Sequence, residues 1–292
     1  TIQEGCDKFC KFCVVPYTRG PEYSRTFLEI LSEARQLVDN GSKEIILLGQ
    51  NVNAYNFNGK KLSDLIFELN KIKDLKRIRY TTSHPKDVTS DLIDAHNKCE
   101  KLMPLLHLPV QSGSTKILED MNRGHTLEDY LIKIEKLKNN KPNIKFSSDF
   151  IIAYPGETED DFEKTLLLMK KIKFINSYSF IFSPRPGTPA SNITPVHDKI
   201  AKERLFNFQK VADQIKKNYI KKLVNSTARV LFENKNKKDD KYFGRDEYFN
   251  SVIVDSNQNL EGKIKDVKIT QHNQNTLFGE IILKEKEKEY AA

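Results

Sequence analysis

Three of the four cysteines of this 292-residue chain lie within eight residues, at Cys6, Cys10 and Cys13. In a cytosolic chain such crowding favours a metal site over a disulfide, because thiols there are kept reduced. Zinc usually takes four protein ligands from two cysteine pairs, whereas Cys99 stands alone far downstream. An iron–sulfur cube is the better match, because three cysteines hold three irons and leave the fourth iron free for a substrate-like ligand. The spacing C-x3-C-x2-C therefore predicts a catalytic iron–sulfur site, with a zinc knuckle or chance clustering as the alternative.

The segments that must position this loop alternate between strand and helix patterns up to about residue 222. Short apolar runs typical of strands stand at residues 1–4, 44–48, 77–82, 105–110, 146–153 and 178–182. Helical patterns separate the runs and open near Thr26, Ser90, Ser114, Thr126 and Thr158. Because parallel strands need a crossover long enough to cover the sheet, six such units predict an α/β fold, an open barrel with helices outside it.

Polar or glycine-containing loops follow the predicted strands. They are residues 6–13, 49–55, 83–85, 111–114, 154–157 and 183–189. In folds of this kind the reactive groups sit on the loops that leave the carboxyl ends of the strands. We therefore expect the functional site at this end of the barrel.

The pattern changes near residue 226. A long helix is predicted over about 195–223, and alternating runs follow at 229–233, 242–244, 251–254, 262–269 and 277–283. These runs predict a small five-stranded antiparallel barrel, similar to the OB fold. We thus expect a first domain over 1–222, a barrel domain over 223–286 and a solvated Lys/Glu tail over 287–292.

The composition sets further bounds. With 38% hydrophobic residues the chain can bury a core, which excludes disorder throughout. The 48 Lys and Arg residues against 40 Asp and Glu residues fit a polyanionic partner, or a Lys-rich solvated surface. No apolar run is long enough for a membrane span and no charged-then-apolar leader opens the chain, so we expect a cytoplasmic protein with no membrane partner. Because Thr1 lies inside a predicted strand, we also expect that an amino-terminal part is missing.

The cysteine motif, with the aromatic Phe12 before its last cysteine, resembles that of the radical S-adenosylmethionine superfamily. Further segments resemble one family within it, the tRNA methylthiotransferases, over essentially the whole chain. These segments are VVPYTRG (14–20), LLGQNVNAY (47–55), TSHP (82–85), HLPVQSGS (107–114), MNR (121–123), PGET (155–158) and SPRPGTPA (183–190). The carboxyl-terminal barrel is similar to a TRAM domain, a small RNA-binding module.

The resemblance implies a [4Fe-4S] cluster on Cys6, Cys10 and Cys13, whose unique iron is chelated by S-adenosylmethionine. One electron from the cluster would break the sulfonium, and the 5'-deoxyadenosyl radical would abstract the C2 hydrogen of N6-isopentenyladenosine at position 37 of tRNA. Sulfur insertion and methyl transfer from a second S-adenosylmethionine would give the 2-methylthio product. An electron-donating reductase and a sulfur donor would be further partners, and we expect a monomer.

The resemblance also implies a set of side chains around S-adenosylmethionine: Phe12, Ser83, Gln111, Ser112, Arg123, Asp149 and Glu157. The phenyl ring would lie beside the adenine, and the serines and the glutamine can hydrogen-bond ribose or methionine groups. The guanidinium can pair with the methionine carboxylate in two-point geometry. The two acidic side chains can accept hydrogen bonds from amino or ribose groups.

Two arginines are candidate contacts to RNA. Arg185 lies in a proline-rich loop that can also be a stiff connection. Arg245 lies among aromatic residues that are either an RNA-stacking platform or, as we favour, part of the barrel core. We expect His84 and His107 to be packing or hydrogen-bonding residues, and Cys99 to be a small buried apolar residue.

The chain departs from the family in one respect. The family uses a second [4Fe-4S] cluster, held by three cysteines of an amino-terminal domain, in sulfur transfer, and here only Cys99 remains. We therefore expect this chain to bind one cluster and cleave S-adenosylmethionine, but not to insert sulfur alone. The alternatives are a methylthiotransferase that acts on threonylcarbamoyl-adenosine or on a ribosomal protein, and a non-catalytic iron–sulfur or metal-containing RNA-binding module.

Overall fold

The computed structural model describes residues 1–236 and 240–282, in two compact units that divide between Ile215 and Lys216. The predicted tail over 287–292 lies outside the described residues. In the part of the chain that is described, no helix has the length and apolar character that a bilayer crossing requires.

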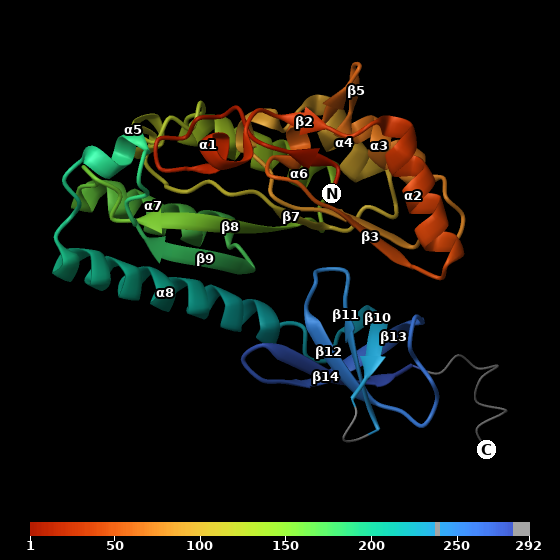
Figure 1. Ribbon diagram of the computed structural model, residues 1–292. Helices are drawn as coiled ribbons and strands as arrows, with labels where there is room; N and C mark the ends of the chain where they lie inside the picture. Colours follow the sequence, from red (N-terminus) through yellow and green to blue (C-terminus); the bar gives the residue numbers. More distant parts are fainter. Residues whose placement is uncertain (237–239, 283–292) are drawn as a thin grey trace. The chain divides into compact units, whose positions relative to one another are not determined.

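The first unit alternates strands and helices in the predicted order (Figure 1). The main helices are α1 (Val15–Arg19), α2 (Phe27–Asp39), α3 (Leu62–Asn70), α4 (Ser90–Lys98), α5 (Thr115–Asp120), α6 (Leu127–Asn140), α7 (Glu159–Ile172) and α8 (Asp198–Lys221). The short 3-10 turns are η1 (Val52–Ala54), η2 (Pro85–Asp87) and η3 (Pro189–Asn192). The strands are β1 (Gln3–Glu4), β2 (Tyr23–Ser24), β3 (Glu44–Leu47), β4 (Asn56–Phe57), β5 (Lys60–Lys61), β6 (Arg77–Tyr80), β7 (Leu105–His107), β8 (Lys145–Ile152) and β9 (Asn176–Ile181).

The central strands are parallel, as the alternation predicts. The strand β3 pairs with β6, and β8 pairs with both β7 and β9. A parallel bridge at Ile78–Leu102 connects β6 to the segment before β7, and a second at Gln111–Phe150 extends the pairing of β7 with β8. Helices α2, α3, α4 and α6 pack against one another in that order outside the strands. Together with the similarities reported below, this arrangement confirms the predicted open barrel.

The first predicted strand differs from expectation. The strand β1 forms an antiparallel ladder with β2, in which Gln3 pairs with Ser24. The chain returns immediately after the cysteine loop and α1, so β2 is the nearest backbone partner. The amide of Ile2 donates to the carbonyl of Leu48 at 2.8 Å, so the start of the chain still lies beside the end of β3.

Local sequence accounts for where the helices begin. Thr126 and Thr158 each accept a hydrogen bond from the backbone three residues on, and Asp129 and Asp161 return a bond to the cap residue. These reciprocal bonds satisfy amide groups that a helix start leaves unpaired. Thr26 caps α2 by accepting from the amide of Glu29.

The second unit is a closed barrel with the strand order β10-β11-β12-β14-β13. Its strands are β10 (Thr227–Lys235), β11 (Lys241–Arg245), β12 (Ser251–Asp255), β13 (Ile264–His272) and β14 (Thr276–Ile281). Five strands are present as predicted, but β12 and β14 are parallel, so the barrel is not wholly antiparallel. The last strand, β14, completes the barrel by pairing with both β12 and β13. It follows β13 directly and runs antiparallel to it, and this places it parallel to β12. A Cβ atom at Gly244 would lie 2.5 Å from the Leu231 carbonyl oxygen, so this close strand approach requires glycine.

Candidate functional site

The cysteine loop is held in shape from two sides. Within the loop, the Cys13 amide donates to the Cys10 carbonyl at 2.9 Å, and Phe9 has a left-handed φ of 48°. The segment after α5 supplies outside contacts: the Lys11 amide donates to the Met121 carbonyl at 3.0 Å, and Asn122 Nδ2 donates to the Phe9 carbonyl at 3.0 Å. Backbone hydrogen bonds and the Asn122 side chain thus position the loop.

The three thiols differ in how far they are buried. Cys10 is buried, and Cys6 and Cys13 are half-buried. Burial raises the pKa of Cys6 to about 11 and raises that of Cys13 as well, and the nearby Cys10 thiol adds to both shifts. In the described ranges no three His, Cys, Asp or Glu side chains are arranged to hold a single metal ion. An iron–sulfur cluster makes a different demand, since each thiolate binds a different iron.

Arg123 supplies positive charge next to these thiols. The residue is buried, and its Nη1 donates to the Cys10 sulfur at 3.5 Å. Its Nη2 donates to the Pro109 carbonyl at 2.7 Å, while Nε has no partner among the described residues. A buried cation beside three cysteines fits a thiolate-ligated cluster, because such a cluster is anionic. The predicted role of Arg123 at the methionine carboxylate stays a prediction.

Ser83 and His84 follow β6 and are both buried, and His84 lies near Arg123. The Ser83 hydroxyl is buried and has no hydrogen-bond partner within the described residues. His84 Nδ1 accepts from the Lys86 amide at 3.1 Å, and its ring lies 5.9 Å from that of His125, measured between centroids. Burial lowers the pKa of both rings, that of His125 to about 4, and the nearby Arg123 adds to this, so both histidines are neutral at physiological pH.

Gln111 and Ser112 lie where the chain leaves β7. Gln111 has a left-handed φ of 76° and pairs with Phe150 in a parallel bridge. The Ser112 hydroxyl accepts from the Ser114 amide at 3.2 Å and lies 3.4 Å from the Thr165 hydroxyl. The structure therefore places Ser112 in a network that holds α7 against this loop.

Gly113 explains why α7 comes so close. A Cβ atom at this residue would lie 2.5 Å from Thr165 Cα, and the Gly113 amide donates to the Thr165 hydroxyl at 2.9 Å. A side chain at this position would push the helix away from the end of β7.

Asp149 lies in the middle of β8, on the sheet face that the helices do not cover. Its Oδ1 is 3.5 Å from His107 Nε2, and His107 Nδ1 is 3.0 Å from the Ser147 hydroxyl. Tyr178 lies opposite Asp149 on β9 and is half exposed. The side chains of Asp149, His107 and Ser147 thus form a polar cluster with Tyr178 beside it. Of these residues, the sequence analysis identified only Asp149 as a site residue.

Glu157 forms contacts with Arg204 and Ala153, which the resemblance does not imply. Its Oε1 accepts from Arg204 Nη1 and from the Ala153 amide, both at 3.0 Å. Burial raises the pKa of Glu157 to about 7, although Arg204 opposes this rise. The structure therefore gives Glu157 a role in joining α8 to the loop after β8. Its predicted contact with S-adenosylmethionine stays a prediction.

Phe12 packs beside the cysteines against a small apolar cluster. This cluster contains Ile117, Met121, Tyr154, Phe182 and Ala190. Its Tyr154 is fully buried. The cluster forms a dry wall next to the cysteine loop, and Phe12 is the half-buried ring at its edge.

The two predicted RNA contacts lie in different units. Arg185 is exposed in the loop between β9 and η3. Arg245, on β11, stacks its guanidinium 4.3 Å from the ring centroid of Phe249 and 5.2 Å from that of Phe243. The aromatic residues divide between the two predicted roles, because Tyr242 is in the barrel core whereas 37% of Phe249 is exposed.

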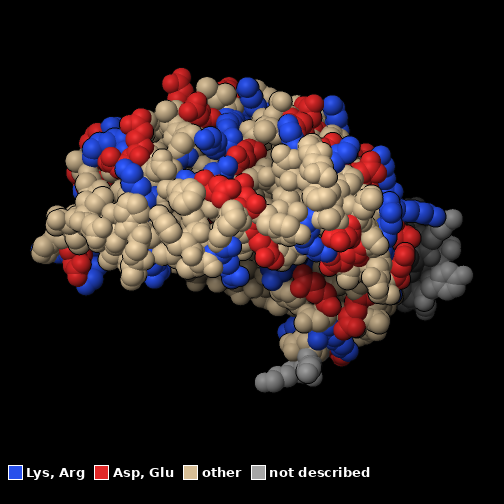
Figure 2. All heavy atoms as spheres, turned by 45° about the horizontal axis from the view of Figure 1, so that its top comes forward, with Lys and Arg blue, Asp and Glu red and all other residues tan. Residues whose placement is uncertain are grey.

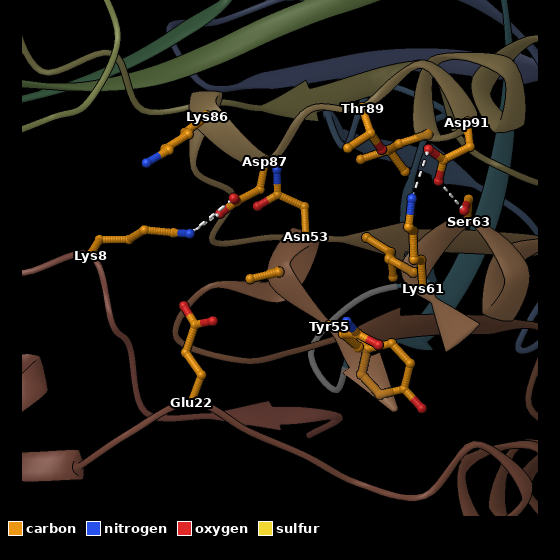
Figure 3. A pocket seen from close by; sticks show the side chains of 14 residues that line it. Lys8, Glu22, Asn53, Tyr55, Lys61, Ser63, Lys86, Asp87, Thr89 and Asp91 are labelled. Carbon is orange, nitrogen blue, oxygen red and sulfur yellow. Dashed lines mark hydrogen bonds and ion pairs between the residues drawn. The ribbon is translucent and has the colours of Figure 1, made fainter. Parts of the chain in front are cut away.

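A polar pocket of about 270 Å³ borders the cysteine loop at Lys8 (Figure 3). Lys8 pairs with Asp87 at 2.9 Å, and Lys61 lies 3.6 Å from Asp91 on the other side. Asn51 Nδ2 donates to Asp87 Oδ2 at 2.8 Å. The paired charges tie the cysteine loop to η2. Over the wider surface, Figure 2 shows basic and acidic side chains interspersed on one face of the molecule.

Comparison with known proteins identifies the class. Residues 1–169 match the model of the radical SAM superfamily, and residues 221–282 match that of the TRAM domain. Two solved structures share the fold: the radical S-adenosylmethionine methyltransferase TsrM from Kitasatospora setae (TM-score 0.54, 15% identity, 65% of this chain and 37% of that one) and the cobalamin-dependent enzyme OxsB (TM-score 0.50, 13% identity, 73% and 31%). The chain belongs to the radical S-adenosylmethionine superfamily.

Within that superfamily the sequence is similar to proteins named tRNA-2-methylthio-N(6)-dimethylallyladenosine synthase, the MiaB family. The protein from Pelagibacter ubique is 60% identical over 294 residues, and the one from Rickettsia akari is 50% identical over 289 residues. The alignments cover 99% and 97% of this chain but 66% and 65% of those proteins, so the chain spans just under two thirds of their length. The family predicted from the cysteine motif and its flanking segments is confirmed.

Proposed function

We propose that this chain is the catalytic and RNA-binding part of a tRNA methylthiotransferase. The reaction would add a 2-methylthio group to N6-isopentenyladenosine at position 37 of tRNA. The observation that carries the proposal is the clamped loop with three thiols beside a buried guanidinium, in a chain 60% identical to a named synthase of this modification. Acting on tRNA, the protein would work in the cytoplasm.

Cys6, Cys10 and Cys13 would hold the [4Fe-4S] cluster. When bound, the cluster supplies the electron that cleaves S-adenosylmethionine to the radical that takes the C2 hydrogen of the adenosine. The chain's own residues support this chemistry by position. Met121 and Asn122 hold the loop, and the apolar wall next to Phe12 keeps water from it.

Several polar groups lie where a cofactor or a base can reach them. The Ser83 hydroxyl is buried and has no partner in the described ranges, so it can bond to S-adenosylmethionine. Asp149 is half-buried on the helix-free sheet face, with His107 fixing one of its oxygens, so its other oxygen can accept from an amino group or a hydroxyl. The geometry thus supports an orienting role for these side chains.

The barrel unit would bind the RNA. Its strand order is that of an OB fold, in which the face of the second and third strands binds oligonucleotides. Arg245 lies on the second strand with two aromatic rings, a combination that suits base stacking and phosphate contact. Arg185 would contact RNA from the first unit. We further expect an electron-donating reductase, a sulfur donor and a monomeric chain.

This chain offers ligands for one cluster. Beyond the cysteine loop only Cys99 remains, and it is buried with 1% of its surface exposed, as predicted. Iron and sulfide analysis of the anaerobically reconstituted chain should give about four irons, one cube per chain. About eight irons per chain would contradict the expectation that this chain cannot insert sulfur alone.

Two assays test the function. The reconstituted chain with dithionite should form 5'-deoxyadenosine from S-adenosylmethionine, and Cys13→Ala should not, whereas Cys99→Ala should. No product from the wild-type chain would favour the RNA-binding module instead. Mass spectrometry of tRNA from a deletion strain, complemented with a gene that joins this chain to the amino-terminal cluster domain of the family, should show the methylthio derivative of isopentenyladenosine. A modified threonylcarbamoyl-adenosine or ribosomal aspartate in its place would establish an alternative substrate.

A further inference from the structure

The guanidinium of Arg123 is held in place from both sides. On one side Nη2 donates to the Pro109 carbonyl at 2.7 Å, just beyond the end of β7. On the other side Nη1 donates to the Cys10 sulfur at 3.5 Å. Only 6% of the residue is exposed, so water does not screen this contact. A cation is therefore fixed against one ligand of the proposed cluster.

This cation lacks a protein anion. Among the residues that the structure describes, no carboxylate forms an ion pair with Arg123, and its Nε has no hydrogen-bond partner. The neighbouring rings of His84 and His125 supply no negative charge, because an imidazole is either neutral or cationic. A buried charge without a counter-ion is strongly unfavourable, and removing one partner of a buried pair costs a similar amount. The negative charge that balances Arg123 must therefore come from the thiolates and what they bind.

Arg123 contacts the sulfur of Cys10, one of the proposed cluster ligands, and should therefore affect how readily the cluster is reduced. Reduction adds one negative charge to an iron–sulfur cluster, and hydrogen bonds to its sulfurs, net charge and solvent exposure set its potential. A hydrogen bond and a positive charge at the Cys10 sulfur both stabilise the reduced state more than the oxidised state.

We propose that Arg123 is a positioning residue that raises the reduction potential of the cluster through its bond to Cys10. The inference rests on the cluster of the proposed function. It differs from the role that the sequence suggests, a bond to the carboxylate of S-adenosylmethionine, because it predicts an effect in the absence of that ligand.

The loop should keep its shape without the Arg123 side chain. The Lys11 amide bonds to the Met121 carbonyl, and Asn122 Nδ2 bonds to the Phe9 carbonyl, so two contacts of the neighbouring residues hold the loop independently. The amide of Arg123 donates to the Leu118 carbonyl, a contact that any side chain preserves. Variants of Arg123 are therefore suitable for measuring the cluster.

The test is an anaerobic redox titration followed by electron paramagnetic resonance, without S-adenosylmethionine or tRNA. Arg123→Gln removes the charge, and Arg123→Lys keeps it. Arg35→Gln removes the same charge from an exposed residue of α2 and is the matched control. We expect the equilibrium constant for one-electron reduction to fall about tenfold in Arg123→Gln, about 59 mV. It should fall less in Arg123→Lys and stay unchanged in Arg35→Gln.

The outcomes separate the possible roles. An unchanged potential in Arg123→Gln, with weaker binding of S-adenosylmethionine, would overturn the proposal in favour of the carboxylate role. If Arg123→Gln takes up no iron but Arg123→Lys does, a potential of Arg123→Lys below that of the wild type would support the proposal, and an unchanged potential would overturn it. Failure of both variants, with thermal unfolding like that of the wild type, would assign Arg123 to cluster assembly and overturn the proposal. A wild-type chain that takes up no iron would refute the proposed function itself.

Discussion

The buried Glu157 predicts an unusual pH dependence of stability. Its side chain is 1% exposed, and burial raises its pKa from 4.5 to about 7 despite Arg204 at 3.0 Å. The native state therefore binds this proton more tightly than the unfolded state does. The stabilising contribution is complete below about pH 4.5 and is lost as the pH rises to about 7. At roughly 1.4 kcal/mol per pH unit the loss amounts to at most about 3 kcal/mol.

Glu157→Gln tests this reasoning, because glutamine has a similar shape and no proton to lose in this range. Urea unfolding followed by far-ultraviolet circular dichroism should be measured from about pH 4.5 to about 8. The free energy of unfolding of the wild type, minus that of the variant, should fall across this range. Glu159→Gln, which changes the exposed carboxylate on the same Arg204, is the control and should show no comparable trend. A difference that rises with pH would show that the ion pair outweighs burial and would refute the argument.

Four further substitutions have defined outcomes. Gly113→Ala should lower the free energy of unfolding by about 3 kcal/mol in urea titrations, because its Cβ would lie 2.5 Å from Thr165 Cα; full stability would refute the close packing of α7. Cys99→Ala should retain the iron content of the wild type, whereas Cys10→Ala should lose most of it, and equal losses would contradict the ligand assignment. Arg245→Gln should weaken binding of an anticodon stem-loop RNA about fivefold in fluorescence anisotropy, through loss of phosphate contact and stacking; unchanged affinity would exclude this surface.

The parts of the fold that depend on nearby residues were predictable. The helix starts at Thr126 and Thr158 follow from a cap residue and an acidic residue three positions on, and the structure shows both reciprocal bonds. The three cysteines and the strand-end loops were likewise visible, because spacing along the chain is enough to define them. Such features need no knowledge of what packs against them.

Features that depend on distant pairing were not predictable. The parallel pairing of β12 with β14 is decided by how the barrel closes, and alternation within each strand does not reveal it. The bond between Glu157 and Arg204 joins residues 47 positions apart, and the contact of Arg123 with Cys10 spans 113 positions. The family resemblance named Glu157 and Arg123 as candidates and did not include Arg204, and the partners of both side chains follow only from the folded chain.

The distinction matters for the chemistry of the cysteine loop. The motif supplies three thiols for the proposed cluster, and it is compatible with many potentials and many substrates. The charge beside the ligands comes from Arg123 in a turn after α5, and the polar group on the open sheet comes from Asp149 on β8. On the roles proposed here, elements remote from the motif in sequence would set how readily the site accepts an electron and what it can bind. Proteins with the same cysteine spacing should accordingly differ in potential wherever the residue at the position of Arg123 differs in charge.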